Sequence, residues 1–347
     1  MTGEWGGPKR ELRGNLHIHT TCSDGSRTLE EIAGLAQGYG LDFIGLNDHF
    51  APSRPSRYQG GVLLLLGSEL NREHSHYLVY GPAPAFGPGQ HEGAKVAAGV
   101  KARGGMGIIA HPFEKGSPLV GKGKHYPWRD WNSEDFQGIE IWNLTSQWRD
   151  SARSLGQSLG QWLLAPYRPF KQGACPQALA RWDELSQKRH VTGIAGSDLH
   201  GPLVRALGCR FRILDYPMLL PALNTYCRAA VTGEGEEDGA RVIEALIRGR
   251  CWIAQDRLCL GRGFFFWAET ERARRGMGEK IPRVGGKAWL RIVLPRRGEI
   301  RLIHNGALLS RLEGRRWDLA VTEAGPYRVE VRLRDVPWLY SNSLYLE

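Results

Sequence analysis

The sequence carries its most informative stretch near the start, NLHIHTTCSDG at residues 15–25. In a β-strand alternate side chains point to the same side, so His17 and His19 present two imidazoles to one point while their neighbours face the other way. A Ser-Asp-Gly turn that contains Asp24 follows directly. Two convergent imidazoles followed by a carboxylate are a start on a metal site.

The same arrangement recurs along the chain, because four short apolar runs each end in a histidine or a carboxylate. Continuous apolar runs of this kind are typical of strands that are buried on both faces of a parallel sheet. In barrels of parallel strands the chemistry gathers at the carboxyl ends of the strands. The runs with their endings are 42–46 before Asn47-Asp48-His49, 62–66 before Gly67-Ser68-Glu69, 106–110 before His111-Pro112, and 191–196 before Ser197-Asp198-Leu199-His200. One such residue alone would be read as a capping residue, whereas the recurrence indicates a multinuclear metal centre.

Taken together, these motifs resemble those of the PHP (polymerase and histidinol phosphatase) superfamily. The resemblance extends from about residue 14 to about residue 255, and the motifs follow one another in the same order. The resemblance implies an α/β fold, a distorted seven-stranded (β/α) barrel with two or three divalent metal ions at its C-terminal mouth. It also implies three sets of ligands. The first set is His17, His19, Glu69 and Asp198; the second is Asp24 and His49 with Glu69 bridging; the third is His76, His111 and His200.

One of these ligands departs from the pattern of some family members, and another is chosen between two neighbouring histidines. Some family members have histidine where this chain has Asp24, so the second set carries an additional negative charge. His76 is preferred to His74 because it leads directly into the apolar residues 77–80. Imidazole and carboxylate ligands suit Mn, Fe or Zn almost equally, so the metal identity stays open.

The remainder of the chain predicts a two-domain organisation, with a metallohydrolase barrel in 1–256 and a small β domain in 257–347. From about residue 257 apolar and polar residues alternate between turns such as Asn305-Gly306, which is typical of antiparallel, sandwich-like β structure. This part carries no cluster of potential ligands, so we expect it to serve packing, oligomer contacts or substrate shaping. The segment 115–131 follows His111 closely and is expected to cover the metal site, and Glu140 and Asn143 are expected to hydrogen-bond behind it.

Charge and cysteine content limit the partners and the location. The net charge of +10 suits a small anionic substrate, such as a phosphate-containing one, or a nucleic acid. No nucleic-acid-binding motif is found, and Arg296-Arg297 and Arg315-Arg316 are expected to solvate hairpin turns, so nucleic acid is not expected as a partner.

No stretch approaches the roughly 18 apolar residues of a membrane span, and 1–13 lacks a signal-peptide core, which predicts a cytoplasmic protein without a membrane partner. Six scattered cysteines indicate reduced thiols. Cys22 is expected to fill a small space behind the site, with a thiolate ligand as the alternative.

These features predict a metal-dependent phosphoesterase that hydrolyses a small phosphate monoester or diester with a metal-bridging hydroxide. His111, Asp198 and His200 form the predicted catalytic set, in which either histidine could protonate the leaving group. Arg72 and Arg205 are the predicted phosphate-binding residues. Further arginines near strand ends are Arg54, Arg57 and Arg149.

Two alternatives stay open. The same metal centre could hydrolyse an uncharged ester, amide or carbamate, with Trp128, Trp131 and Trp142 forming an aromatic pocket. The metal could also be structural in a binding module. Structural sites are usually closed units of four ligands, and nine candidate ligands around one mouth argue against this second alternative.

Overall fold

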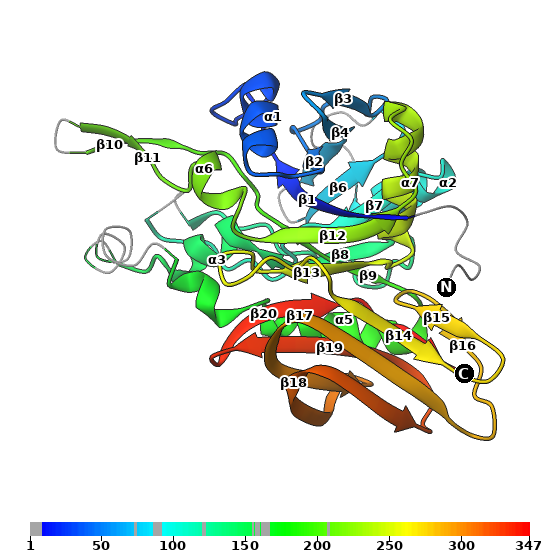
Figure 1. Ribbon diagram of the computed structural model, residues 1–347. Coiled ribbons are helices and arrows are strands. Elements are labelled where there is room, and N and C mark those ends of the chain that lie inside the picture. Colours follow the sequence, from blue (N-terminus) through cyan, green and yellow to red (C-terminus); the bar gives the residue numbers. More distant parts are fainter. Residues whose placement is uncertain are drawn as a thin grey trace.

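The computed structural model describes residues 9–72, 75–85, 92–119, 123–154, 156, 160, 167–206 and 209–347. It has the mixed α/β class that the sequence predicts, with large sheets and short helices (Figure 1). The described helices include none that is long and apolar enough to cross a membrane.

The first sheet is built around the strand that carries His17. Strand β1 pairs in parallel with β2, β2 pairs in parallel with β4, and β12 closes against β1 in the antiparallel sense. Helix α1 (Leu29–Gly38) connects β1 to β2 and begins with a capping box in which the Thr28 and Glu31 side chains each bond the other's backbone N–H. The bounds are β1 Arg10–Ile18, β2 Phe43–Leu46, β3 Arg57–Gln59, β4 Val62–Leu66 and β12 Asn224–Ala229.

The second sheet has the order β5-β6-β7-β8-β9. Strands β7, β8 and β9 run in parallel, whereas β6 is antiparallel to both of its neighbours. Isolated parallel bridges between Ile18 and Leu199 and between His49 and Glu69 join this sheet to the first, so the polar strand ends of both sheets meet. The bounds are β5 Ser68–Arg72, β6 Ser75–Tyr80, β7 Met106–Ile109, β8 Gly138–Asn143 and β9 Thr192–Gly196.

Short helices cover these sheets. Helix α2 packs on β6 and β7, α5 packs on β8, and α7 packs on β4 and β12. Helix α7 ends where Gly249 adopts a positive φ of 64°, before strand β13 (Cys251–Ala254) returns to the sheet. The remaining bounds in this part are α2 Gly93–Ala102, α3 Leu144–Ser151, η2 Pro169–Gln172, α5 Pro176–Lys188, β10 Leu203–Ala206, β11 Cys209–Arg212, α6 Tyr216–Leu219 and α7 Gly235–Ile247.

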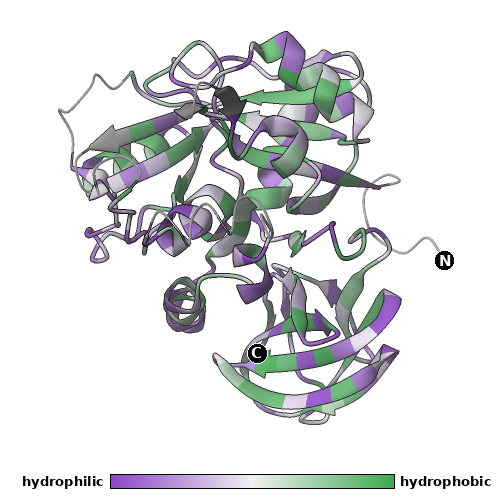
Figure 2. Ribbon diagram, turned by 90° about the vertical axis from the view of Figure 1, so that its left-hand side faces the viewer, coloured by the Kyte–Doolittle hydropathy of each residue, from purple (hydrophilic) through white to green (hydrophobic). Residues whose placement is uncertain are grey.

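The C-terminal strands are antiparallel apart from β16, which pairs in parallel with β21. Apolar residues of β17 such as Leu290, Ile292 and Ile300 are buried, as the alternation predicts, in a core that they share with Tyr226 of β12 and Trp252 of β13. Figure 2 shows the alternation as bands along the long strands. Strand β20 pairs with β13, so these strands continue the first sheet. The bounds are β14 Phe265–Glu269, β15 Arg274–Gly276, β16 Lys280–Ile281, β17 Ala288–His304, β18 Ala307–Val321, β19 Gly325–Leu333, β20 Val336–Ser341 and β21 Leu344–Leu346.

One expectation for this region is wrong. The turn between β17 and β18 lies at Asn305-Gly306, where both residues have positive φ, and not at the arginine pairs. Arg296-Arg297 and Arg315-Arg316 instead lie opposite each other in the middle of the hairpin, at a register shift. The sequence pattern could not show this, because the shift depends on which residues of the two strands pair.

Candidate metal centre

The structure brings all nine predicted ligands together in three overlapping groups. Within each group the candidate ligand atoms lie within 4.8 Å of one another. His19 belongs to two groups, and so does Glu69, so the groups form one continuous site. The groups are His17, His19, Glu69 and Asp198; Glu69, His76 and His111; and His19, Asp24, His49 and His200.

Glu69 lies at the centre of the site and is almost completely buried. Its two carboxylate oxygens face different histidines, which allows one carboxylate to bridge two cations. The neighbours of Oε1 are His76 Nδ1 at 2.8 Å, His17 Nε2 at 3.4 Å and His111 Nε2 at 3.5 Å; those of Oε2 are His19 Nε2 and His49 Nδ1, each at 3.3 Å.

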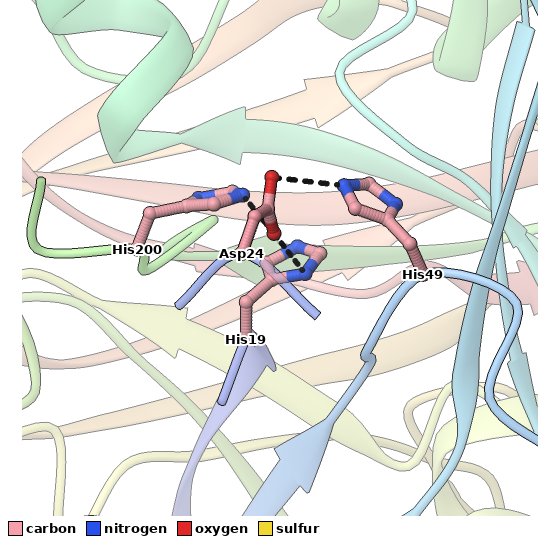
Figure 3. A group of neighbouring side chains, drawn as sticks. All are labelled: His19, Asp24, His49 and His200. Carbon is pink, nitrogen blue, oxygen red and sulfur yellow. Dashed lines mark ion pairs between the residues drawn. The ribbon is translucent and has the colours of Figure 1, made fainter. Parts of the chain in front are cut away.

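The outer group surrounds Asp24, as Figure 3 shows. Asp24 Oδ1 lies 3.3 Å from His200 Nε2 and 3.6 Å from His19 Nδ1, and Oδ2 lies 3.5 Å from His49 Nε2. The Asp24 side chain is 55 % exposed, whereas His19 is fully buried. The outer group is therefore the side of the site that is open to solvent.

His200 lies in a different group from the one expected. The family resemblance assigns it to His76 and His111, but its ring stacks on that of His19 with 4.0 Å between centroids. The reason is the parallel bridge between Ile18 and Leu199, which carries the segment after β9 across the end of β1. His200 is thereby directed towards Asp24.

Many polar atoms of the site are buried without a hydrogen bond, which is the test of whether these residues suit a metal. Buried polar groups without partners are rare and costly, and coordination of a cation would satisfy them. Imidazole nitrogen and carboxylate oxygen are also the donors that transition metals prefer. Within the described residues, the buried atoms without a well-aligned hydrogen bond are His17 Nε2, both ring nitrogens of His19 and of His76, His49 Nδ1, His111 Nδ1 and Glu69 Oε1, although His76 Nδ1 and Glu69 Oε1 lie 2.8 Å apart.

Burial and neighbouring charges shift the pKa values of the titratable groups in the site. Burial opposes charge on Glu69 and Asp198, but the surrounding histidines hold the pKa of both carboxyls well below the usual range. Burial likewise opposes protonation of His111 and His200, yet nearby carboxylates raise the pKa of each to about 9. Without a metal the carboxylates therefore hold protons on neighbouring histidines, and a bound cation would take the place of those protons.

Three residues of the site have unusual backbone conformations. His17, His111 and Asp198 have φ values of 63°, 25° and 51°. Non-glycine residues seldom adopt positive φ, and each instance costs on the order of 1–3 kcal/mol. All three side chains point into the groups around Glu69, so the surrounding fold maintains this strain at the site.

Glu140 supports two of the strained residues from behind. It is buried on β8, its Oε1 lies 3.0 Å from His17 Nδ1, and its Oε2 accepts 2.8 Å hydrogen bonds from the His111 backbone N–H and from Asn143 Nδ2. A Cβ atom at Gly196 would overlap Oε1, so only glycine fits there. Glu140 and Asn143 thus form hydrogen bonds behind the metal groups, as expected.

Asp48 organises the turn that presents Asp24, and its role was not predicted. Its carboxylate accepts hydrogen bonds from the Thr20 backbone N–H (2.7 Å), the Thr20 hydroxyl (2.7 Å) and the Ser23 hydroxyl (2.6 Å). Its place in the Asn-Asp-His motif beside His49 is the only sequence signal for it. Cys22 lies on the same turn and is exposed, so the expectation that it fills a space behind the site is wrong.

Glu114 anchors the segment that follows His111, and no sequence pattern pointed to it. Its buried carboxylate accepts hydrogen bonds from Arg149 Nη1 (2.6 Å), the Ser146 hydroxyl (3.1 Å) and the Tyr126 backbone N–H (3.1 Å). The Tyr126 ring stacks on that of His76, with 4.2 Å between centroids. The segment 115–131 therefore reaches the metal groups through Tyr126, as expected of a cover.

The predicted substrate-binding side chains lie largely elsewhere or outside the described residues. Arg149 is held by Glu114 and by the Lys124 carbonyl, so it is not a free phosphate ligand. Arg54 and Arg57 are exposed. Arg72 and Arg205 lie on β5 and β10, and their side chains are outside the described part. Trp128 packs in the core against Tyr77 and Phe136, and Trp142 is buried, so an aromatic pocket of three tryptophans is not formed.

Comparisons with known proteins give distant likenesses only. No family model and no curated protein matches the chain. Among solved structures, a two-domain protein containing a predicted PHP-like metal-dependent phosphoesterase from Bacteroides vulgatus is 16 % identical, with a TM-score of 0.46 over 97 % of this chain and 96 % of that one. A protein from Bifidobacterium adolescentis that is assigned by prediction as a metal-dependent phosphoesterase is 16 % identical, with a TM-score of 0.32 over 54 % of this chain and 87 % of that one. An amidohydrolase from Chromobacterium violaceum with bound sulfate and no metal is 15 % identical, with a TM-score of 0.33 over 59 % and 94 %.

Proposed function

We propose that this protein is a metal-dependent hydrolase of phosphate esters, with a PHP-type barrel in 1–256 and a β domain in 257–347. The observation that carries the proposal is the position of Glu69, whose two oxygens face histidines of different groups. A carboxylate placed in this way supports a multinuclear centre, and centres of two adjacent metals are typical of phosphatases and nucleases. Divalent ions bound there would activate water and neutralise the oxygen atoms on which charge develops.

The proposed roles of the site residues follow from how deeply each is buried. His17, Glu69 and Asp198 are buried and pre-oriented, so they would hold metal without rearrangement. Asp24 is exposed, so the substrate would approach from its side. Glu140 fixes the Nδ1 side of His17, which leaves Nε2 free to face Glu69 and Asp198.

The non-reacting part of the substrate has a place beside the metal groups. A cavity of about 260 Å³ borders His111 and Glu140. Its walls combine apolar side chains such as Phe113 with amides such as Gln177, and Arg153 lies at its rim. We propose that a small phosphate ester meets the metal ions from the Asp24 side and that its leaving group extends past His111 into this cavity.

The apolar part of the cavity favours a second candidate. Phe113, Ile141 and Trp142 contribute to its wall, and they suit the uncharged leaving group of an ester, amide or carbamate. The two candidates share the metal groups and differ only in the reacting group.

A direct assay separates the candidates. Protein loaded with Mn, Fe or Zn is offered p-nitrophenyl phosphate, bis-p-nitrophenyl phosphate and an aryl carbamate. We expect turnover of a phosphate ester that inorganic phosphate inhibits competitively and that the His17→Ala/Glu69→Ala variant lacks. Turnover of the carbamate alone, insensitive to phosphate, would establish the second candidate instead. Equal turnover by the double variant would assign the activity to a contaminant.

A further inference from the structure

The positive charge of the chain is concentrated away from the metal centre. Residues 257–347 contain 18 Lys and Arg against 10 Asp and Glu, so they carry +8 of the net charge of +10. The long hairpin of β17 and β18 lies at the end of the molecule opposite α1 and β3 (Figure 1). A substrate at the metal groups does not account for this charge.

Four arginines gather at the register shift in the middle of this hairpin. Val293 pairs with Arg316 and Gly298 pairs with Gly314, which leaves residues 294–297 of β17 bulging opposite Arg315. Arg296, Arg297, Arg315 and Arg316 are all exposed. Like charges across a ladder destabilise a hairpin, so this arrangement requires a compensating anion or a benefit other than stability.

The protein itself compensates only part of that charge. Arg297 lies 3.6 Å from Glu313, and Arg316 lies 3.3 Å from Asp318. Among the described residues, no carboxylate lies within ion-pair distance of Arg296 or Arg315. Two guanidinium groups therefore remain available at the centre of the cluster.

An aromatic surface continues directly from these arginines. Cross-strand partners point to the same face, and Phe265, Val293 and Arg316 are neighbours in one row across β14, β17 and β18. The next rows on that face contain Trp267 beside Arg291, and Trp289 beside Glu269. Phe265 and Trp289 are 44 % and 40 % exposed, which is unusual for side chains of this size.

The aromatic rings of this face already interact with cations. Arg228 lies 4.2 Å from the centroid of Phe265, Arg274 lies 4.4 Å from that of Trp267, and Arg291 lies 5.3 Å from that of Trp289. One side of each ring is therefore covered, and a base would stack on the other side. Arg291 is also paired with Glu269 and Asp318, at 3.5 and 3.0 Å, so the middle of the face is nearly neutral. By strand alternation Arg297 and Arg316 share this face, and the unpaired Arg296 and Arg315 lie next to them in the chain, so positive charge borders the three aromatic side chains at the bulge.

We propose that the outer face of β14, β17 and β18 binds single-stranded nucleic acid. Phe265, Trp267 and Trp289 provide surfaces on which unpaired bases stack, and the arginines at the bulge contact phosphates. This combination of stacking platform and basic border is the mode by which sheets bind single strands without sequence preference. A duplex hides its bases from such a face, so only its phosphates would interact with the protein.

From the sequence, nucleic acid was not expected as a partner, because no nucleic-acid-binding motif is found and the two arginine pairs were expected to lie at hairpin turns. Strand pairing brings them together, since residues about twenty positions apart become neighbours across the hairpin. The arginines on the edge strand β18 would also discourage edge-to-edge pairing of two sheets, and the experiment distinguishes that role from binding.

The test is fluorescence anisotropy of the full chain with a labelled oligo(dT) of about 20 nucleotides, in EDTA and at about 50 mM salt. We expect binding that a duplex of the same length competes for poorly. Arg297→Gln/Arg316→Gln, which removes the two arginines on the aromatic face, should weaken it at least about tenfold and reduce the slope of log K against log salt by about 1.4, or about 0.7 for each phosphate that is no longer neutralised. Phe265→Ala and Trp289→Ala should each weaken it about fivefold or more with little change in slope.

Control variants and other ligands make the outcome decisive. Arg103→Gln/Arg129→Gln removes the same charge from exposed positions outside the β domain and should leave binding unchanged. Equal affinity for duplex, or aromatic variants that bind normally, would overturn the proposal in favour of a general polyanion surface. Binding only to vesicles containing phosphatidylserine would point to the exposed Leu308, Leu309 and Leu312 of β18 and to a membrane. Absence of oligonucleotide binding, with aggregation of the arginine variants, would leave the arginines as protectors of the edge.

Discussion

The inner and outer parts of the metal centre use the same residue types in opposite surroundings. Around Glu69 the ligand atoms are buried, and the backbones of His17, His111 and Asp198 are strained. Around Asp24 the carboxylate is mostly exposed and His49 and His200 are partly accessible. From this difference we expect the inner part to bind metal more tightly, and the outer part to exchange ligands and to meet the substrate.

Removal of the central carboxylate should have the largest effect. Glu69→Gln deprives both inner groups of their shared ligand, so we expect loss of the metal ions there and a fall in activity of about 10³-fold or more, equivalent to about 4 kcal/mol in the transition state. Metal analysis after gel filtration and kcat/KM measure the two effects. A variant that retains full metal content would show that Glu69 is not the bridge.

Substitution in the outer group should affect fewer ions. Asp24→Asn removes the charge that faces His19, His49 and His200, and we expect loss of about one metal ion per chain with the inner ions retained. Asp24→His offers a different ligand of the kind found in some PHP proteins and serves as the matched variant. If Asp24→Asn empties the entire centre, the distinction between inner and outer parts is wrong.

Weakening of the support behind the inner part should have an intermediate effect. Glu140→Gln keeps the shape but loses the charge that orients His17, and partners of metal-bound histidines typically contribute about 10–100-fold in metal affinity. Competition with a fluorescent chelator measures this affinity, and circular dichroism checks the fold. An unchanged affinity would limit Glu140 to holding the backbone of His111.

The metal-free protein should become less stable as the pH rises from about 7 to about 9.5. Partner carboxylates raise the pKa of His17, His49, His111 and His200, to about 9 for the last two. A raised pKa contributes stability that is complete below the unfolded value of about 6.5 and is lost as the pH passes the folded value. Urea unfolding in EDTA at several pH values tests this. Stability that increases over this range would mean that these histidines are neutral in the metal-free fold.

The smallest effect should come from the covering segment. Tyr126→Ala removes the ring that stacks on His76, and an aromatic pair of this kind contributes about 0.5–1.5 kcal/mol. We expect metal affinity to fall by about two- to tenfold, whereas Tyr126→Phe keeps the ring and should behave as the natural protein. Identical loss in both variants would assign the effect to the phenol hydroxyl.

The sequence predicted the parts of the site that depend on local pattern. His17 and His19 follow from strand alternation, and Glu69 and His111 from their positions at strand ends. The group to which His200 belongs could not be predicted, because it depends on the bridge between Ile18 and Leu199. Nor could Glu114, whose partners lie up to 35 residues away in the chain.

For the fold too, features that depend on local sequence pattern were predicted, whereas features that depend on pairing between strands were not. Alternating residues predicted the antiparallel strands after residue 257, and apolar runs predicted β2, β4, β7 and β9. The antiparallel orientation of β6 and the bulge at Arg296-Arg297 depend on pairing between strands, which a linear pattern does not contain.

The pairing of β20 with β13 has a consequence for biosynthesis. Strand β1 can pair with β12 only after more than 200 further residues have been synthesised. The open edge of β13 is covered only when residues 339–341 of β20 have been synthesised. Long-range pairing of this kind slows folding and exposes strand edges in the meantime. Once residue 256 has left the ribosome, and until residues 339–341 have followed, the nascent chain would carry all nine candidate ligands beside an unprotected β-edge, and this is the stage at which we expect chaperones to bind.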